Sequence, residues 1–394
     1  MKRFISASAL LLFGVASACG KDYDGLALKE HASGGSPARG GSGNSGGSSG
    51  SGGHAQGGTT STGGIATSGT GGRIVEPPGR SVTTFFHGIV DAERITFCLA
   101  RHGDGEPELT GRPRPTGGLA YGTSLALELD FGEDAVLPYV IAGELDLVQG
   151  LDCEAAIAKA NDEMRAVARA ELGAGGASGA GGEAGGGGEG GQGEPVAPRL
   201  RVIALPEVPA GTLSAGYSML YAAVGCIGGP AFTSEVEEDA CGEGYSPTKP
   251  TASAVLVQLS RKVAFDKLSL QALHASLAMP TLTVFSTPPD TAVRASVMVT
   301  FDLARGVIAP RSPTTELSVD DYGVTIPEWK AEAVRDSSTY ASELWVDVLE
   351  RAGLDALEPT HGYTLVVVGP RGQLGTAGFW NQPAIGVVDN NPEP

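Results

Sequence analysis

The sequence lacks most of the motifs and charge patterns that mark common catalytic and nucleic-acid-binding proteins. It contains no His-Glu-x-x-His metal motif and no Gly-Lys-Ser or Gly-Lys-Thr of a phosphate-binding loop. Basic residues are scarce, 27 against 45 acidic ones, and the densest basic group, Gly111–Pro115, is expected to form a single turn. The net charge of −18 repels a phosphate backbone, so nucleic acid is excluded as a partner. No segment after the N-terminus holds a continuous apolar run long enough to span a membrane.

The N-terminus has the layout of a signal peptide that ends at a cysteine. Two basic residues open the chain, and a short apolar segment leads to the small residues Ala16 to Ala18 and then to Cys19. The stretch Val-Ala-Ser-Ala-Cys resembles a bacterial lipobox, although Ala16 stands where leucine is usual. We expect residues 1–18 to be removed and Cys19 to be acylated; simple secretion is the alternative. Gly20 favours the outer membrane or cell surface as the location of the anchored chain.

Two glycine-rich tracts divide the chain. Residues 32–72 are rich in Gly, Ser and Thr and almost uncharged, so they cannot bury enough apolar surface to offset the entropy of ordering. With their flanks they are expected to form a disordered tether over 19–79, behind the lipidated terminus. The second tract, 173–194, lies within a folded region and is expected to be a loop insertion, because closure entropy grows only slowly with loop length.

Hydrophobic periodicity predicts a mainly β body. Apolar and polar residues alternate at 95–99, 125–131 and 297–303, the period of half-buried strands. The continuous apolar run Leu365 to Val368 is typical of a fully buried strand. Two helices are expected, at 152–172 with Asp152 as N-cap, and at 339–352 before Gly353.

The two halves of the body share one order of motifs. A strand ending near His87 corresponds without gaps to a strand ending near His274. A Tyr-Gly pair follows in each half, at 121–122 and 322–323, and each half closes on a Gly-Tyr strand, at 216–225 and 362–369. We interpret this as two copies of one β domain, at 80–250 and 251–394. Chance similarity between β-rich segments is the alternative.

These motifs resemble the bacterial surface domain of unknown function numbered 4397. Its members show His-Ala-Ser-Pro-Asp-Ala-Pro, then a Val-Asp-Val-Tyr strand and a closing Tyr-Thr-Val-Val-Gly. Here His274 to Ser276 and Pro280 fit, whereas the copy at His87 lacks the prolines and has Phe97-Cys98 in the following strand. The resemblance covers residues 80–370 and implies two immunoglobulin-like β-sandwich domains, each with about one helix, and no established chemistry.

Four cysteines remain once Cys19 is set aside, an even number in an exported protein. They allow three pairings. We expect Cys226 to pair with Cys241, because the two are close in sequence, and Cys98 then to pair with Cys153. A disulfide that closes a loop of about 15 residues contributes roughly 3 kcal/mol in the chain-entropy model. A zinc site is the alternative, without any Cys-x-x-Cys to support it, and we expect no metal or cofactor.

Histidines and carboxylates offer few catalytic candidates. His87 and His274 hold matching strand ends, which favours a repeated structural role, such as hydrogen bonding at a turn, over catalysis. Five carboxylates crowd the predicted disulfide loop. They are Glu235, Glu237, Glu238, Asp239 and Glu243. Calcium binding is one interpretation of them, and a solvated acidic loop is the one we prefer.

Together these observations predict a lipid-anchored cell-surface protein rather than an enzyme. Its β domains are expected to bind envelope or extracellular polysaccharide or protein, with the membrane as partner through Cys19. A secreted hydrolase with a site not recognisable from sequence is one alternative. A purely structural envelope component is the other.

Overall fold

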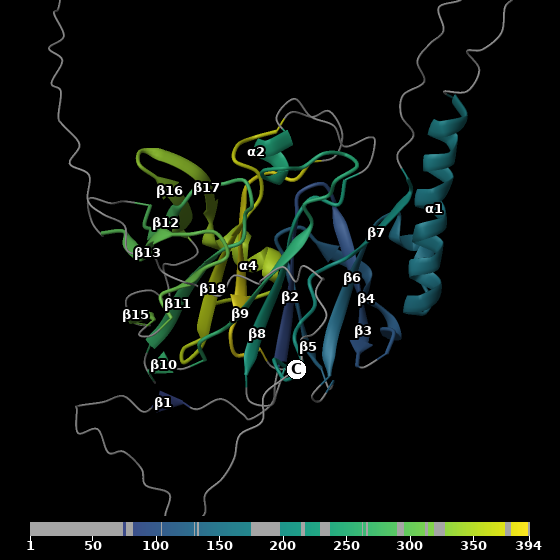
Figure 1. Ribbon diagram of the computed structural model, residues 1–394. Helices are drawn as coiled ribbons and strands as arrows, with labels where there is room; N and C mark the ends of the chain where they lie inside the picture. Colours follow the sequence, from purple (N-terminus) through teal and green to yellow (C-terminus); the bar gives the residue numbers. More distant parts are fainter. Residues whose placement is uncertain are drawn as a thin grey trace, which may run out of the picture. The chain divides into compact units, whose positions relative to one another are not determined.

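The computed structural model is mainly β, with its strands arranged in several sheets (Figure 1). Residues 67–394 form one compact unit. The structure describes residues 74–75, 82–103, 105–129, 131, 134–174, 198–213, 217–228, 237–261, 263–264, 267–289, 295–311, 314–318, 328–374 and 380–392. The expected signal peptide, Cys19, nearly all of the tether and most of the 173–194 insertion lie outside these residues.

The first half of the unit consists of two four-stranded sheets. One sheet has the order β5 (Ser124–Glu128), β2 (Val82–Ile89), β8 (Ser218–Gly225), β9 (Ser253–Gln258). The other has the order β4 (Glu108–Ala120), β3 (Arg94–His102), β6 (Ala135–Gly143), β7 (Leu200–Ala204). Their facing side chains, among them Phe85, Tyr221, Phe97 and Val140, form one buried core. The first half is therefore a β-sandwich.

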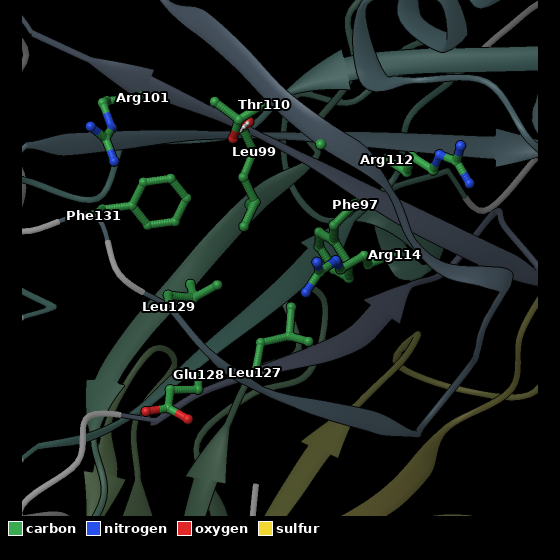
Figure 2. Close-up of a pocket in the computed structure, with 11 residues that line it drawn as sticks. Phe97, Leu99, Arg101, Thr110, Arg112, Arg114, Leu127, Glu128, Leu129 and Phe131 are labelled. Carbon is green, nitrogen blue, oxygen red and sulfur yellow. Dashed lines mark hydrogen bonds between the residues drawn. The ribbon is translucent and has the colours of Figure 1, made fainter.

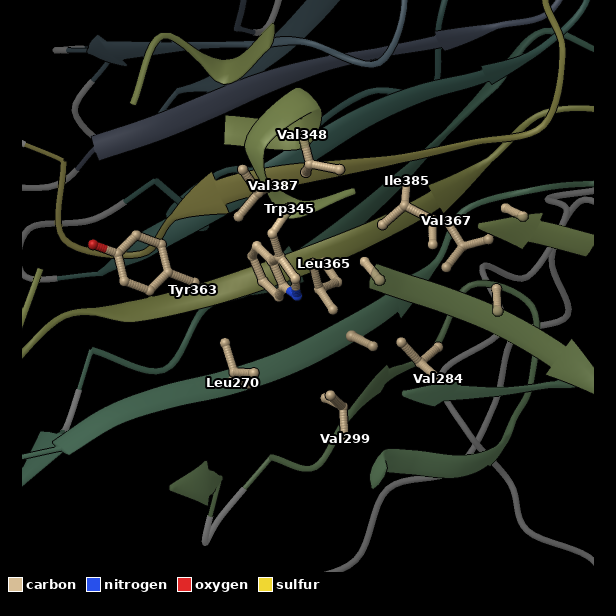
Figure 3. Close-up of a cluster of buried hydrophobic side chains, with 14 of the residues drawn as sticks. Leu270, Val284, Val299, Trp345, Val348, Tyr363, Leu365, Val367, Ile385 and Val387 are labelled. Atoms are coloured by element: carbon tan, nitrogen blue, oxygen red, sulfur yellow. The ribbon is translucent and has the colours of Figure 1, made fainter. Parts of the chain in front are cut away.

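The second half repeats this plan with one five-stranded and one four-stranded sheet. The first sheet contains β14 (Ile308–Ala309), β11 (Lys267–His274), β18 (Gly362–Val368) and β19 (Ala384–Asp389), with β15 (Thr315–Ser318) paired to β11. The second has the order β13 (Val297–Leu303), β12 (Leu282–Thr287), β16 (Lys330–Arg335), β17 (Ser338–Leu344). A short pair, β1 (Ile74–Val75) with β10 (Val263–Ala264), forms a further sheet. Trp345 fills the core between the two larger sheets, against Leu270, Val284 and Leu365 (Figure 3).

The two sandwiches pack against each other through their inner sheets. Phe86, Leu220 and Val224 of the first half form one buried cluster with Val366 and Val368 of the second. β2, β8 and β18 are consequently buried along their whole length on both faces. This explains the continuous apolar run at 365–368, because a strand with two covered faces has no polar side to alternate with.

Two glycines permit this close approach of the inner sheets. A Cβ on Gly386 would lie 2.5 Å from the ring of Phe86, which is completely buried. A Cβ on Gly88 would lie 2.8 Å from Val368. Neither position has room for a side chain without moving a packed neighbour.

The predicted repeat is visible in the strand pairing. β2 pairs in parallel with β8, and β11 pairs in parallel with β18, so each His strand lies beside the closing strand of its own half. The Tyr-Gly pair at 322–323 lies outside the described residues. The expected boundary at residue 250 is too early, because β9 at 253–258 pairs with β8 and completes the first sandwich.

The predicted helices are confirmed in one case and partly wrong in the other. α1 (Cys153–Ala174) begins after Asp152, whose carboxylate accepts the backbone N–H of Ala155 at 2.8 Å. The segment 339–344 is strand β17, because it pairs with β16, and the helix α4 covers only Trp345–Ala352. Gly353 ends α4 in the left-handed conformation. A short helix, α2 (Glu237–Cys241), and a 3-10 turn, η1 (Leu145–Val148), complete the described helices. None of the helices in the described ranges is both long and apolar enough to cross a membrane.

Candidate functional site

An irregular edge strand creates the candidate site in the first sandwich. β4 pairs with β3 at Ile95–Leu119, then Phe97–Arg114, then Leu99–Thr110. From Ile95 to Phe97, β3 advances two residues while β4 advances five. From Phe97 to Leu99, β3 advances two residues while β4 advances four, so β4 carries large bulges. The basic segment Gly111–Pro115 lies inside this strand, and the expected single turn is wrong. The sequence Arg-Pro-Arg-Pro did not predict a strand, because proline is rare in regularly paired β-strands.

Hydrogen bonds from β3 and β4 side chains hold the bulges. The Thr96 hydroxyl donates to the Pro115 carbonyl at 3.0 Å, and the Arg94 guanidinium donates to the Gly117 carbonyl at 3.0 Å. The Thr110 hydroxyl donates to the Leu99 carbonyl at 3.4 Å. These bonds satisfy backbone carbonyls that regular pairing would have satisfied.

A cavity of about 270 Å³ lies between bulged β4, β3 and the segment at and beyond the end of β5 (Figure 2). Its walls are mainly apolar. The apolar lining comes from Phe97, Leu99, Leu127, Leu129 and Phe131. Phe97 belongs to the buried core, whereas Leu127 and Leu129 are half-buried. The cavity is therefore a place where the sandwich core reaches the surface, and we call it the β4 cavity.

Arginines provide most of the charge around the β4 cavity. Arg101 lies over the ring of Phe131 at 5.9 Å and pairs with Asp134 at 3.4 Å. Arg112 and Arg114 are exposed, and neither has an ion-pair partner within the described ranges. Figure 2 shows Arg101 beside Phe131 and Arg114 beside Phe97. One carboxylate, Glu128, also lines the cavity.

The position of Arg114 follows from its pairing. Directly opposed residues in an antiparallel pair point to the same face, so Arg114 shares a face with Phe97, whose side chain is directed into the core. An arginine on an inward face at a sheet edge packs its stem on apolar surface and extends its guanidinium to water. Arg114 can therefore contact the apolar wall and a ligand in the cavity at once.

A second hollow, of about 640 Å³, lies where β3 and β4 meet the turn before η1. Two ion pairs engage four of its charged side chains. Arg199 donates to Glu144 at 2.5 Å and holds the pKa of that carboxyl below its usual value, chiefly by this hydrogen bond. Arg201 is bound to Asp91. The arginines of this hollow are therefore engaged with carboxylates or, for Arg94, with the Gly117 carbonyl, whereas Arg112 and Arg114 of the β4 cavity have no ion-pair partner in the described ranges.

His87 and His274 have the repeated structural role that the sequence predicts. Nδ1 of His87 accepts the N–H of Ile89 at 3.2 Å, and Nδ1 of His274 accepts the N–H of Ser276 at 3.3 Å. Nε2 of His274 also donates to the Pro280 carbonyl at 2.7 Å. Burial lowers the pKa of His87 to about 3 and that of His274 to about 4. Both rings are therefore neutral and serve as turn-forming groups.

A buried ion pair next to His87 is the largest feature that sequence reasoning missed. The Asp91 carboxylate accepts from Arg201 at 2.6 Å, from the N–H of Ile227 at 2.9 Å and from the N–H of Gly228 at 2.8 Å. Asp91 is fully buried, and 5% of the Arg201 side chain is exposed. Asp91 stands four residues after His87, the spacing of the aspartate in the quoted motif, which was the available signal.

The structure forms the expected disulfides. Cys226 bonds to Cys241, and Cys98 bonds to Cys153, which fastens α1 to β3. Within the described residues, no three His, Cys, Asp or Glu side chains gather as metal ligands.

The acidic loop is only partly described. Glu235 and the side chains of Glu237 and Glu238 lie outside the described residues. Asp239 lies 3.6 Å from Arg371. The calcium interpretation therefore gains no support from the carboxylates that the structure places.

Comparisons with known proteins place the chain in no family. No protein-family model matches the sequence, and no curated protein matches it.

Proposed function

We propose that this chain is a lipid-anchored, non-enzymatic cell-surface protein that binds an envelope or extracellular polysaccharide or protein through the β4 cavity. The observation that carries the proposal is the cavity itself, an apolar hollow of about 270 Å³ at a bulged sheet edge with arginines at its rim. Apolar walls with a few oriented polar groups are the usual composition of ligand sites.

Sequence features support the anchor and the export. Cys19 follows a signal-like segment and precedes a Gly/Ser-rich stretch. Four further cysteines form two disulfides, which suits an oxidising compartment. We also propose that the two sandwiches are immunoglobulin-like and related to the surface domain numbered 4397, which their shared His-strand pairing supports.

Two measurements test this function. The intact mass of the protein from the membrane fraction should correspond to a chain that starts at Cys19 and carries a diacylglycerol and an acyl group. An unmodified chain in the medium would contradict the anchor.

The second measurement is sedimentation of the mature chain, carrying Cys19→Ser to prevent acylation, with isolated bacterial envelope. Envelope pretreated with periodate, which cleaves sugar diols, should lose the binding if the ligand is polysaccharide. Envelope pretreated with protease should lose it if the ligand is protein. No sedimentation with untreated envelope would refute the binding function.

A further inference from the structure

We infer that the β4 cavity takes the acidic sugar units of a polysaccharide, with Arg112 and Arg114 binding their carboxylates. This inference rests on the proposed binding function and names the ligand class for the same site. Its first support is charge. The chain carries −18 overall, yet the polar rim of this cavity is mostly cationic.

The two arginines are available for an external anion. Arg101 is already engaged with Asp134 and Phe131, whereas Arg112 and Arg114 are exposed and have no ion-pair partner in the part of the chain that the structure describes. A guanidinium binds a carboxylate through two parallel hydrogen bonds, which makes arginine more selective for this group than lysine.

The walls suit the ring of a sugar. The C–H face of a pyranose is apolar, and Leu127 and Leu129 present half-buried aliphatic groups beside Phe97. A carboxylate at the ring edge then lies toward the rim, where Arg114 extends from the position opposite Phe97. The ligand therefore needs an apolar face and an acidic edge in one unit, which a uronic acid has.

The edge strand disfavours the other class of ligand, an extended acidic peptide. A peptide that adds to a sheet needs N–H donors along the edge. Pro113 and Pro115 lack them, and the bulges interrupt the register on both sides of Arg114. A ligand at this edge must therefore be recognised through its substituents and not through backbone hydrogen bonds. A polysaccharide carries such substituents at regular spacing.

Calorimetric titration of the full mature chain in detergent tests the inference, with a galacturonic acid trimer as the probe and a galactose trimer as its neutral match. We expect the acidic trimer to bind and the neutral trimer to bind at least about tenfold more weakly, and raising salt from about 0.05 to about 0.5 M to weaken binding of the acidic trimer. Arg112→Ala/Arg114→Ala should reduce its affinity about tenfold or more. The control Arg165→Ala/Arg169→Ala removes the same charge from exposed positions on α1 and should leave the affinity unchanged.

Several results would overturn the inference. Equal binding of both trimers would remove the role of the carboxylate, and binding of decanoate without the acidic trimer would replace the sugar by a fatty acid. If the double variant binds normally but self-associates, the arginines protect the sheet edge instead. If the protein still sediments with envelope but does not bind the trimer, the inference of an acidic sugar ligand is refuted while the proposed binding function stands. Loss of sedimentation as well would refute the proposed function.

Discussion

The buried pair of Asp91 and Arg201 gives the sharpest test of how the first sandwich is held together. Asp91→Ala leaves the Arg201 guanidinium in the interior without its carboxylate and removes the acceptor for the N–H groups of Ile227 and Gly228. Breaking one side of a buried ion pair costs about 3–5 kcal/mol. Each orphaned buried donor costs about 1–3 kcal/mol. Because these contributions overlap, we expect a loss of about 5 kcal/mol in the free energy of unfolding.

Urea unfolding followed by tryptophan fluorescence measures this loss. Since a domain of ordinary stability has about 5–15 kcal/mol in total, Asp91→Ala leaves a protein close to unfolding. Asp91→Asn keeps the size of the side chain and one acceptor oxygen. It should therefore lose less free energy of unfolding than Asp91→Ala, and its unfolding transition should remain measurable. Arg201→Met should also reduce the free energy of unfolding less than Asp91→Ala does, because the Asp91 carboxylate keeps its two backbone N–H donors.

A matched control comes from the exposed pair of Glu144 and Arg199. Glu144→Ala should change the unfolding midpoint little, because water already solvates both charges. If Asp91→Ala stays within about 1 kcal/mol of the native protein, the reasoning from burial is refuted. Equal effects of Asp91→Ala and Glu144→Ala would refute it as well.

Three further predictions concern the strand ends and the contact between the sandwiches. His87 and His274 are neutral when folded and gain protons below pH ~6.5 when unfolded, so stability should fall by about 2 kcal/mol for each between pH ~7 and ~5. His274→Asn should show about half the pH dependence in urea titrations; an unchanged slope would contradict the burial of that ring. Gly386→Val should lower the melting temperature far more than Gly105→Val, because its Cβ meets Phe86, and equal shifts would argue against the tight sheet contact. Asn381→Ala should destabilise by about 2 kcal/mol, since the amide donates to the carbonyls of Ile89 and Ala92 across the sandwiches; hydrogen exchange near those residues that matches the native protein would count against it.

Local patterns predicted those strands and helix ends that depend on neighbours in the sequence. The alternation at 297–303 predicted β13, and Asp152 predicted the start of α1. The prediction of a helix from residue 339 failed because the segment 339–344 is paired with β16, a partner that periodicity does not reveal. The boundary at 250 failed for the same reason, since β9 belongs to the first sandwich by pairing alone.

The candidate site was less predictable than the fold. The sequence shows Arg112 and Arg114 as a small basic group, and the alternating Pro113 and Pro115 are more typical of a turn than of a strand. Only the pairing of β4 with β3 places Arg114 on the same face as Phe97 and opens the cavity. Asp91 and Arg201 are 110 residues apart, and although the spacing of Asp91 from His87 matches the motif, nothing in the sequence marks Arg201 as its partner.

The sequence by itself determined the mainly β class, the repeated His strands, the start of α1 and the end of α4, because each follows from spacing, composition or a residue's own conformational preference; it favoured the observed disulfide pairs among three possible pairings. The tertiary structure alone decided which sheets lie inside, where the bulged strand leaves the core open, and which charges are buried. Those outcomes depend on contacts between segments that are distant in the sequence. The free energy of a charged or polar side chain differs between water and a packed interior, and the sequence alone does not say which of the two surrounds it.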